Sequence, residues 1–195
     1  TPDVPSFISA LESNPAARVP EIELDTVRGR RRLPTALAPP YPLAGRRVAW
    51  VAVTTNHVFA DLVRRELLAD GAEILPAPDA EADGIVLMSD AARDLSERDG
   101  LSERLAEVWR RQGVIAAVGP AALFAIEQVP DLRKKKMTTD PSLSAEVKRL
   151  GGRYVGGAMV ADGRWITATG ADRASVRSFA RAVRRALWAL DSPFA

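Results

Sequence analysis

Residues 113–123 combine a short apolar segment, a Gly-Pro pair and a second apolar segment in an order that is typical of a reactive site. Gly113–Val118 predicts a buried strand, Gly119-Pro120 predicts a sharp turn, and the following residues predict a helix whose N-terminus faces that turn. Enzymes use such a turn to present a nucleophilic Cys or Ser. This chain offers Ala117 and Val118 there, so the pattern predicts a nucleophile site that lacks its nucleophile.

Polar side chains follow two other predicted strands at their carboxyl ends. They belong to Thr54, Thr55, Asn56 and His57 after the first strand, and to Ser89 and Asp90 after the third. Ligands of open α/β sheets bind outside the carboxyl ends of the strands, so we expect these groups to face the Gly119 turn. A histidine near a carboxylate can act as a general base at neutral pH, and His57 near Asp90 therefore predicts acid–base chemistry.

The predicted site contains two sets of residues, and these residues also have a purely structural interpretation. The catalytic set is His57, Asp90 and Ser89, and the ligand-binding set is Thr55, Asn56, Phe59, Ala117, Val118 and Gly119. Free amide groups at the start of the helix after Gly119 would hold an anion or a polarised oxygen. The competing interpretation is that His57 is a solvated residue at a helix start and that Ser89-Asp90 caps the segment that follows.

The composition excludes several classes of protein. The 195 residues are enough for one domain with a sizeable core and an appendage, and 47% of them are hydrophobic. The chain has no Cys, which excludes disulfides, thiolate metal sites and thiol catalysis. With a single His, only carboxylates remain as metal ligands, so we expect no metal site and no cofactor. A net charge of +2 is too small to indicate a nucleic-acid partner.

No segment predicts membrane insertion or secretion. The apolar runs are far shorter than the ~20 residues that span a bilayer, and no charged-then-apolar signal opens the chain. We therefore expect a cytoplasmic protein without a membrane partner. The excess of Arg over Lys and the many Ala residues are typical of a GC-rich, actinobacterial genome.

Residues 1–44 differ from the rest of the chain in their high proline content. A Pro-rich segment cannot form a core of its own, yet residues such as Phe7 and Leu11 are too apolar for a free tail. Pro5 predicts a short helix through Leu11, followed by extended chain. We expect an arm that lies on its own domain or on a partner, so that the chain forms a homodimer or binds a partner protein through residues 1–44. The basic run Arg28–Arg32 lies near acidic residues and predicts a solvated or partner-facing surface.

Residues 45–195 alternate between predicted strands and helices. Strands are expected at 47–53, 72–75, 84–88, 113–118, 136–139, 154–155, 158–160 and 165–167, and helices at 58–69, 102–112, after 120, at 140–150 and at 171–191. The apolar run Arg47–Val53 is typical of a parallel strand that is buried on both faces. The turn Ala161–Gly163 predicts a hairpin between the last two strands. This alternation predicts a three-layer α/β/α sandwich with a mostly parallel sheet and a C-terminal hairpin.

Several local sequences carry a resemblance to a known family. They are Arg47–Val53 followed by a helix and Asp70–Ile74, then Ala82–Leu87, Gly113–Ala122, Tyr154-Val155, and Val160–Thr167 before the last helix. Their order and content resemble the ThiJ/PfpI superfamily, which implies the class I glutamine amidotransferase-like, flavodoxin-like fold. The likeness covers about residues 46–191 and is most specific in the Gly119-Pro120 turn and in the hairpin.

The resemblance also implies a catalytic Cys that this chain does not have. Ala117 stands where the family has its nucleophilic Cys, and Val118 where many members have a His. Phe59 stands at the position of the Glu that supports this Cys, and Ser89-Asp90 replaces the Gly-Gly pair that supplies oxyanion-hole amides. Because these departures occur together, we do not expect the thiol-dependent activities of the family.

Two functions of different classes are compatible with this pattern. The first is a thiol-independent enzyme of small-molecule or secondary metabolism, of the lyase, hydratase or cyclase type. It would use acid–base or oxyanion-stabilising chemistry in the pocket beside the Gly119 turn. The alternative is a non-catalytic pseudoenzyme or accessory domain that binds a ligand or stabilises a partner protein. Large-subunit catalases carry a thiol-free domain of this fold, which makes the alternative physically reasonable.

Overall fold

The chain divides into two compact units, residues 1–40 and 41–195. The computed structural model describes residues 22–24, 31–33, 42–76, 81–170 and 173–190. In the first unit, strands β1 (Ile22–Leu24) and β2 (Arg31–Leu33) pair in antiparallel fashion. The helix expected at residues 5–11, and most of the arm to which we assign partner contacts, lie outside the described residues.

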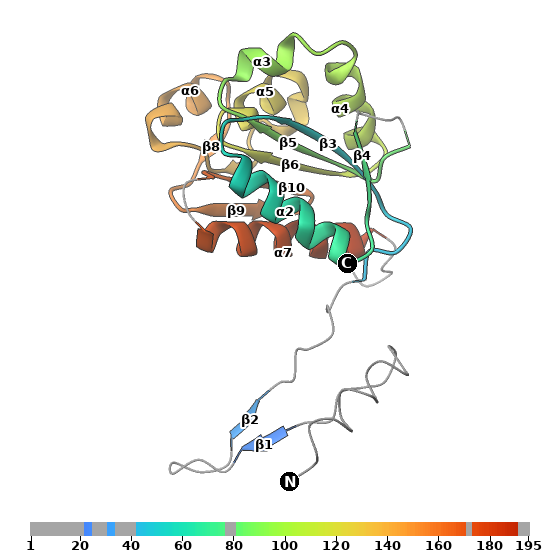
Figure 1. Ribbon diagram of the computed structural model, residues 1–195. Coiled ribbons are helices and arrows are strands. Elements are labelled where there is room, and N and C mark those ends of the chain that lie inside the picture. Colours follow the sequence, from blue (N-terminus) through green and yellow to red (C-terminus); the bar gives the residue numbers. More distant parts are fainter. Residues whose placement is uncertain (1–21, 25–30, 34–41, 77–80, 171–172, 191–195) are drawn as a thin grey trace. The chain divides into compact units, whose positions relative to one another are not determined.

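A six-stranded sheet forms the centre of the second unit (Figure 1). Its order is β4 (Glu73–Leu75), β3 (Arg47–Val53), β5 (Gly84–Ser89), β6 (Val114–Val118), β10 (Trp165–Ala168) and β9 (Met159–Asp162). Neighbouring strands are parallel except β9, which pairs antiparallel with β10. Strands β5 and β6 are buried along their whole length, as their continuous apolar sequences predict. The expected parallel sheet with a C-terminal hairpin is confirmed.

Helices cover both faces of this sheet and complete three layers (Figure 1). On one face lie α3 (Ala92–Ser96), α4 (Leu101–Arg110) and α5 (Ala121–Gln128), and on the other lie α2 (His57–Ala69) and α7 (Arg173–Ala189). Each face holds its own cluster of buried apolar side chains. The expected α/β/α sandwich is confirmed. No helix in the described ranges is both long and apolar enough to cross a membrane.

Strand β6 contributes side chains to both clusters in alternation. Ile115 and Ala117 pack under α4 and α5, whereas Val114, Ala116 and Val118 pack under α2 and α7. Successive side chains of a strand point to opposite faces, so a central strand with five apolar residues must be covered on both sides. Both helical layers therefore pack on this strand, and the packing fixes the position of the turn that follows it.

The expected strand at residues 136–139 is shorter in the structure. Strand β7 ends at Met137 (Lys136–Met137) and pairs in parallel with β8 (Arg153–Tyr154). The next two residues are buried and bond elsewhere: the Thr138 amide donates to Thr167 Oγ1 at 2.8 Å, and Thr139 Oγ1 donates to the Gly119 carbonyl at 2.8 Å. Hydrogen bonds to the main sheet therefore end β7 early and tie this segment to the turn after β6.

Two further elements differ from expectation in detail. The helix expected from residue 140 begins as a 3₁₀ turn, η2 (Pro141–Leu143), and continues as the short helix α6 (Ser144–Arg149). In the C-terminal hairpin, β9 extends to Asp162, which is paired with Trp165. The turn is therefore formed by residues 163–164 alone. Gly163 has φ +66°, a left-handed conformation that a two-residue hairpin turn requires and that glycine adopts without strain.

An ion pair joins the two helices on one face of the sheet. Arg184 Nη1 on α7 lies 2.5 Å from Asp70 Oδ2, at the C-terminus of α2, and 3.9 Å from Glu66 Oε2. The side chains of Arg184 and Asp70 are only 13% and 4% exposed. A buried charge that loses its partner is strongly destabilising. Removing either member of this pair should therefore lower the free energy of unfolding.

We predict that Asp70→Asn lowers the free energy of unfolding by about 3 kcal/mol, because it leaves the Arg184 charge buried without its main partner. Chemical denaturation followed by circular dichroism measures this difference. Asp61→Asn, on an exposed position of the same helix, is the matched control and should change stability by less than about 0.5 kcal/mol. Equal effects of the two substitutions would contradict the assignment.

Candidate functional site

A pocket of about 440 Å³ lies at the carboxyl ends of β3, β5 and β6. Its lining residues are Thr54, Asn56, Phe59, Met88, Ser89, Asp90, Val118, Gly119, Pro120, Asp140, Ser142, Leu143, Thr169 and Gly170. The pocket is where the doubly wound topology predicts a ligand site. Of the residues predicted from the sequence, Asn56, Phe59, Ser89, Asp90, Val118 and Gly119 line it, whereas Thr55, His57 and Ala117 do not.

The turn after β6 is built around Gly119, which has φ +62°. Its amide donates to the Ala168 carbonyl at 2.9 Å, and a Cβ added to it would lie 3.4 Å from the Ser89 carbonyl oxygen. A side chain here would be strained by the left-handed backbone. The turn therefore lies at residues 119–120, as the sequence predicts, and β6 continues through Val118.

Ala117 lies inside β6 and not at the turn. It is fully buried, and its register partners are Leu87 on β5 and Thr167 on β10. The neighbouring Val118 is 8% exposed and lines the pocket. Ala117, which the resemblance places at the family's nucleophile position, is thus part of the core between the sheet and α5.

Three amide groups beside the turn are used within the fold. The Ala122 amide donates to Gly119 at 3.1 Å, the Leu123 amide donates to Pro120 at 3.0 Å, and Pro120 has no amide hydrogen. On the neighbouring strand, the Asp90 amide donates to Val53 at 3.2 Å. An oxyanion hole needs donors that are not already satisfied, so these three amides are not available for one. The pocket therefore contacts a ligand mainly through its side chains.

Asp90 accepts two short hydrogen bonds at the edge of the pocket. Thr54 Oγ1 donates to Oδ1 at 2.6 Å, and the Thr55 amide donates to Oδ2 at 2.6 Å. The Thr54 hydroxyl, followed by the Thr55 amide, lowers the pKa of the Asp90 carboxyl below its ordinary value of 3.8, because both bonds favour the ionised form. These contacts connect the loops that follow β3 and β5, and they keep Asp90 negatively charged at neutral pH.

Asn56 caps the start of α2, whereas His57, the first residue of the helix, is exposed. Asn56 is the N-cap: its Oδ1 accepts from the Phe59 amide at 3.2 Å, and its Nδ2 donates to the Gly170 carbonyl at 2.9 Å. His57 is exposed, and its imidazole makes no hydrogen bond within the described residues. A positive charge on it makes the smallest contribution to the lowered pKa of Asp90. The two side chains are therefore coupled by charge and not by a hydrogen bond.

Ser89 is buried and engaged in its own turn. Its hydroxyl donates to the Ala91 carbonyl at 2.6 Å and accepts from the Ala91 amide at 3.2 Å. This reciprocal contact closes the turn between β5 and α3, whose N-cap residue Ala91 has no side-chain cap. Phe59 is also buried and packs against Phe179 of α7, with ring centroids 6.1 Å apart. It forms an apolar wall of the pocket.

Asp140 is a pocket residue that the sequence analysis did not assign to the site. Its Oδ1 accepts from the Ser142 hydroxyl at 2.6 Å and from the Ser142 amide at 2.8 Å. The hydroxyl and then the amide lower the pKa of this carboxyl below its ordinary value of 3.8. The local signal was present, because Asp-Pro-x before a helix is typical of an N-cap. Its position in the pocket depends on Thr139 bonding to Gly119, which the local sequence does not predict.

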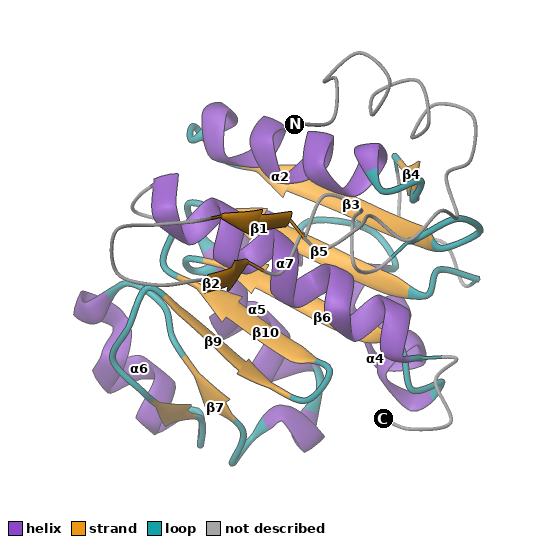
Figure 2. Cartoon of the chain, turned by 90° about the horizontal axis from the view of Figure 1, so that it is seen from below, coloured by secondary structure: helices purple, strands orange, loops and turns teal. Residues whose placement is uncertain are grey.

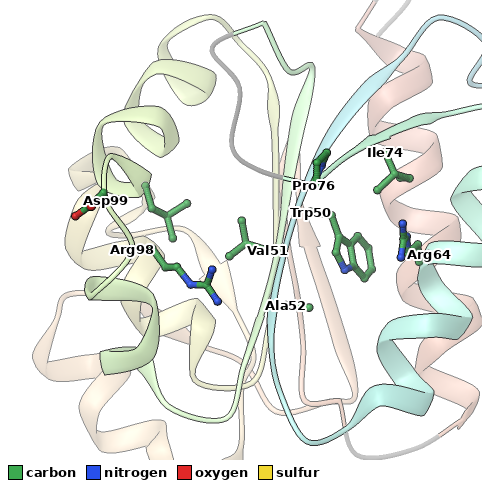
Figure 3. Close-up of a pocket in the computed structure, with 9 residues that line it drawn as sticks. Trp50, Val51, Ala52, Arg64, Ile74, Pro76, Arg98 and Asp99 are labelled. Carbon is green, nitrogen blue, oxygen red and sulfur yellow. The ribbon is translucent and has the colours of Figure 1, made fainter.

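A second hollow of about 520 Å³ lies beside the edge of β3 (Figure 3). Trp50 and Arg64 lie on one side of the strand, whereas Val51 and Arg98 lie on the other (Figure 3). Adjacent strand residues point to opposite faces, so Trp50 and Val51 line this hollow from opposite sides of the sheet. The pocket beside the Gly119 turn lies at the carboxyl ends of three parallel strands and is therefore taken as the candidate site. Among the described residues, no group of three His, Asp or Glu side chains is placed to hold a metal ion.

Comparison with known families agrees with this architecture. The model of the DJ-1/PfpI family matches residues 51–185, which is more than half of the chain. This chain belongs to the DJ-1/PfpI family. The resemblance read from the sequence is thereby confirmed, and the absence of Cys from the chain sets this member apart from the family's thiol chemistry. Comparison with curated proteins gives no match.

Solved structures of the same superfamily share the fold at low sequence identity. A two-domain DJ-1/ThiJ/PfpI-like and ferritin-like protein from Anabaena variabilis has a TM-score of 0.62 and 16% identity, over 73% of this chain and 49% of its own. This chain thus spans about half of that protein. Schizosaccharomyces pombe DJ-1 has a TM-score of 0.57 and 15% identity, over 76% and 100%. Drosophila melanogaster DJ-1beta has a TM-score of 0.57 and 18% identity, over 75% and 91%.

We predict that Thr54→Val reduces the dependence of stability on pH. A carboxyl with a lowered pKa in the folded state stabilises the protein above its unfolded pKa, and this stability is lost as the pH falls through the folded value. Thr54→Val should therefore cost less than about 1 kcal/mol at pH 7, because Asp90 is mostly exposed, and less still at about pH 2.5. Urea denaturation at both pH values measures the two differences.

Ser96→Ala provides the control for this measurement. It removes a hydrogen bond from the Ser96 hydroxyl to the Arg93 carbonyl, at 2.7 Å, in which no titrating group takes part. Its effect on stability should be the same at both pH values. A Thr54→Val effect that is likewise independent of pH would show that Asp90 gains nothing from the Thr54 hydroxyl.

We predict that a thiol restored by Ala117→Cys is unreactive in the folded protein, because position 117 is fully buried inside β6. Because the chain has no Cys, each variant carries a single thiol, and labelling with a disulfide reagent reports on that position alone. Ser142→Cys, at an exposed position of the same pocket, is the control. Labelling at 117 should be slower by a hundredfold or more, roughly the ratio set by local opening. Equal rates would place residue 117 in the pocket.

Proposed function

We propose that this chain binds a small organic cation, an amine or a guanidine, in the pocket beside the Gly119 turn, without thiol chemistry. One observation supports this most strongly: the carboxylates of Asp90 and Asp140 line the same pocket, and hydrogen bonds lower the pKa of both. Two ionised carboxylates produce a negative potential that attracts cations and repels anions. No Lys or Arg is present among the described lining residues to neutralise it.

The carboxylates retain capacity to accept hydrogen bonds from a ligand. A carboxylate offers about four acceptor sites; Asp140 uses two of them within the protein, and Asp90 uses at least two. Both contacts to Asp140 are made to Oδ1, which leaves Oδ2 available for an N–H donor. Thr54 and Ser142 hold the two carboxylates in place, so a ligand would meet prearranged acceptors and lose little free energy in ordering them.

The remaining walls of the pocket limit the size of the ligand and favour an apolar group on it. Its volume of about 440 Å³ lies within the range of small-molecule sites. Phe59, Met88, Val118 and Leu143 supply apolar surface beside the carboxylates. A ligand that carries a compact apolar group next to its positive charge would satisfy both kinds of wall. This proposal is closest to the ligand-binding, non-catalytic alternative of the sequence analysis.

Proton transfer by His57 and Asp90 is a second candidate function. It is supported by the influence of the His57 charge on the pKa of Asp90, which places the two groups within electrostatic range. The proposal of pure binding expects His57→Gln to leave ligand affinity unchanged and expects no exchange of ligand C–H protons in D₂O. The proposal of proton transfer expects such exchange in the native protein and its loss in His57→Gln.

The binding proposal is tested with two probes of similar shape and opposite charge, 2-phenylethylammonium and 3-phenylpropanoate. Calorimetry and backbone NMR shifts should show binding of the ammonium at the pocket and no binding of the carboxylate. Asp140→Asn should weaken ammonium binding about fivefold, because Asn retains the N-cap oxygen but removes the charge. Asp61→Asn, away from the pocket, should have no effect. Preference for the carboxylate, or equal affinity in Asp140→Asn, would contradict the proposal.

Assembly and location remain predictions. We expect the chain to form a homodimer or to bind a partner protein through residues 1–44, and to be cytoplasmic. Analytical ultracentrifugation of the full chain and of a chain that begins at residue 45 compares their masses. Equal oligomeric states would show that the arm is not needed for assembly.

A further inference from the structure

A groove of about 690 Å³ lies between helix α7 and the β9–β10 hairpin, away from the ligand pocket. Helix α7 lines it with Arg181, Ala182, Arg185 and Ala186, and β9 lines it with Met159 and other residues. The groove and the pocket have no lining residue in common. A proposal about the groove therefore stands independently of the proposed function.

The charge along α7 is neutralised on one face only. Arg184 pairs with Asp70 and Glu66 of the neighbouring helix. Arg177, Arg181 and Arg185 follow one another at four-residue spacing, which places them on a single face, and all three are exposed. Within the part of the chain that the structure describes, none of the three has an ion pair or a side-chain hydrogen bond. Arg181 and Arg185 line the groove, and neither has an acidic partner among the described residues.

The groove lies where a further helix would complete the layer on this face of the sheet. Helices α2 and α7 cover the buried side chains of β3, β5, β6 and β10. Strand β9 lies at the edge of the sheet, beyond α7 (Figure 2). Its residue Met159 is only half-buried, as are Ala182 and Ala186 of α7. An apolar floor is thus left open beside a row of cations.

We propose that this groove binds an acidic amphipathic helix of a partner protein. Residues 178–189 of α7 line the groove over a length of about 16 Å, which is the length of a three-turn helix. One face of the partner helix would carry small apolar residues to cover Met159, Ala182 and Ala186. An adjoining row of Glu or Asp at four-residue spacing would pair with the arginines.

Charge selects this occupant over a second copy of the chain. A symmetric dimer through α7 would bring Arg181 and Arg185 against the same residues of the partner copy, and like charges in contact oppose association. A small anion would satisfy one or two arginines and leave the apolar floor uncovered. An acidic amphipathic helix would pair with the arginines, cover the apolar floor and match the length of the groove.

The probe for this proposal is a synthetic 14-residue helical peptide with Glu every fourth residue and an Ala/Leu face, labelled for fluorescence anisotropy. The full chain should bind it, with NMR shifts on α7 and β9, and binding should weaken with added salt. The double variant Arg181→Glu/Arg185→Glu should weaken binding at least about tenfold and should bind the Lys version of the peptide instead. Arg104→Glu, an exposed arginine on the opposite face of the sheet, should leave binding unchanged.

Each alternative occupant has its own result, and each would overturn the proposal. Equal binding of the Glu and Lys peptides, or equal weakening by Arg104→Glu, would show that the groove does not select by charge at these arginines. Octanoate binding as tightly as the peptide would identify a small-anion site. Self-association of the full chain that is lost in the double variant would identify a second copy as the occupant. Asp140→Asn should leave peptide binding unchanged, which separates this test from that of the ligand pocket.

Discussion

Strand β6 is covered on both of its faces, and this constraint fixes the rest of the architecture. Its five side chains alternate between the core under α4 and α5 and the core under α2 and α7. Such a strand must lie in the interior of the sheet, with parallel neighbours on both sides. The turn after it is therefore held at one place, against the Ser89 carbonyl of β5 and the Thr139 hydroxyl. The candidate site is a consequence of where this strand ends.

The same constraint limits which groups of the site can meet a ligand. Ala117 is buried on the face of the sheet that α5 covers and does not line the pocket, and the amides of Ala122 and Leu123 bond within the fold. What remains exposed to a ligand is a set of side chains held by their own hydrogen bonds. Thr54 positions Asp90, and Ser142 positions Asp140. The lowered pKa values of both carboxyls keep them charged, so the pocket is better suited to holding a cation than to donating a proton.

The fold could be predicted from the sequence because the patterns that indicate strands and helices are local and recur along the chain. Apolar runs such as 47–53 and 84–88, with helices between them, admit few arrangements other than a parallel sheet covered on both faces. Boundaries were less predictable where a tertiary contact ends an element, as Thr138 does for β7. The five-residue helix α3 was not expected, because so short a helix has no periodicity to detect.

The candidate site was only partly predictable. Loops that follow neighbouring parallel strands must meet, and Asn56, Ser89 and Asp90 were placed in the pocket on that basis. The turn at Gly119 was predicted as well, but the burial of Ala117 away from the pocket was not, because it depends on how β6 packs under α5. Asp140 reaches the pocket through a segment with no regular structure before it, so no periodic pattern indicates its position. The row of arginines on α7 is visible in the sequence, but which described residues lie within reach of it depends on the packing of the helix.

The central claim is that two ionised carboxylates at this pocket form a cation site. NMR titration of the carboxyl carbons of Asp90 and Asp140, in the full chain with and without 2-phenylethylammonium, tests it most directly. The account predicts that both groups titrate below the ordinary pKa of 3.8 in the free protein, and that the ammonium lowers both pKa values further. Titration of either group at or above its ordinary value, or no response of either to the ammonium, would contradict it.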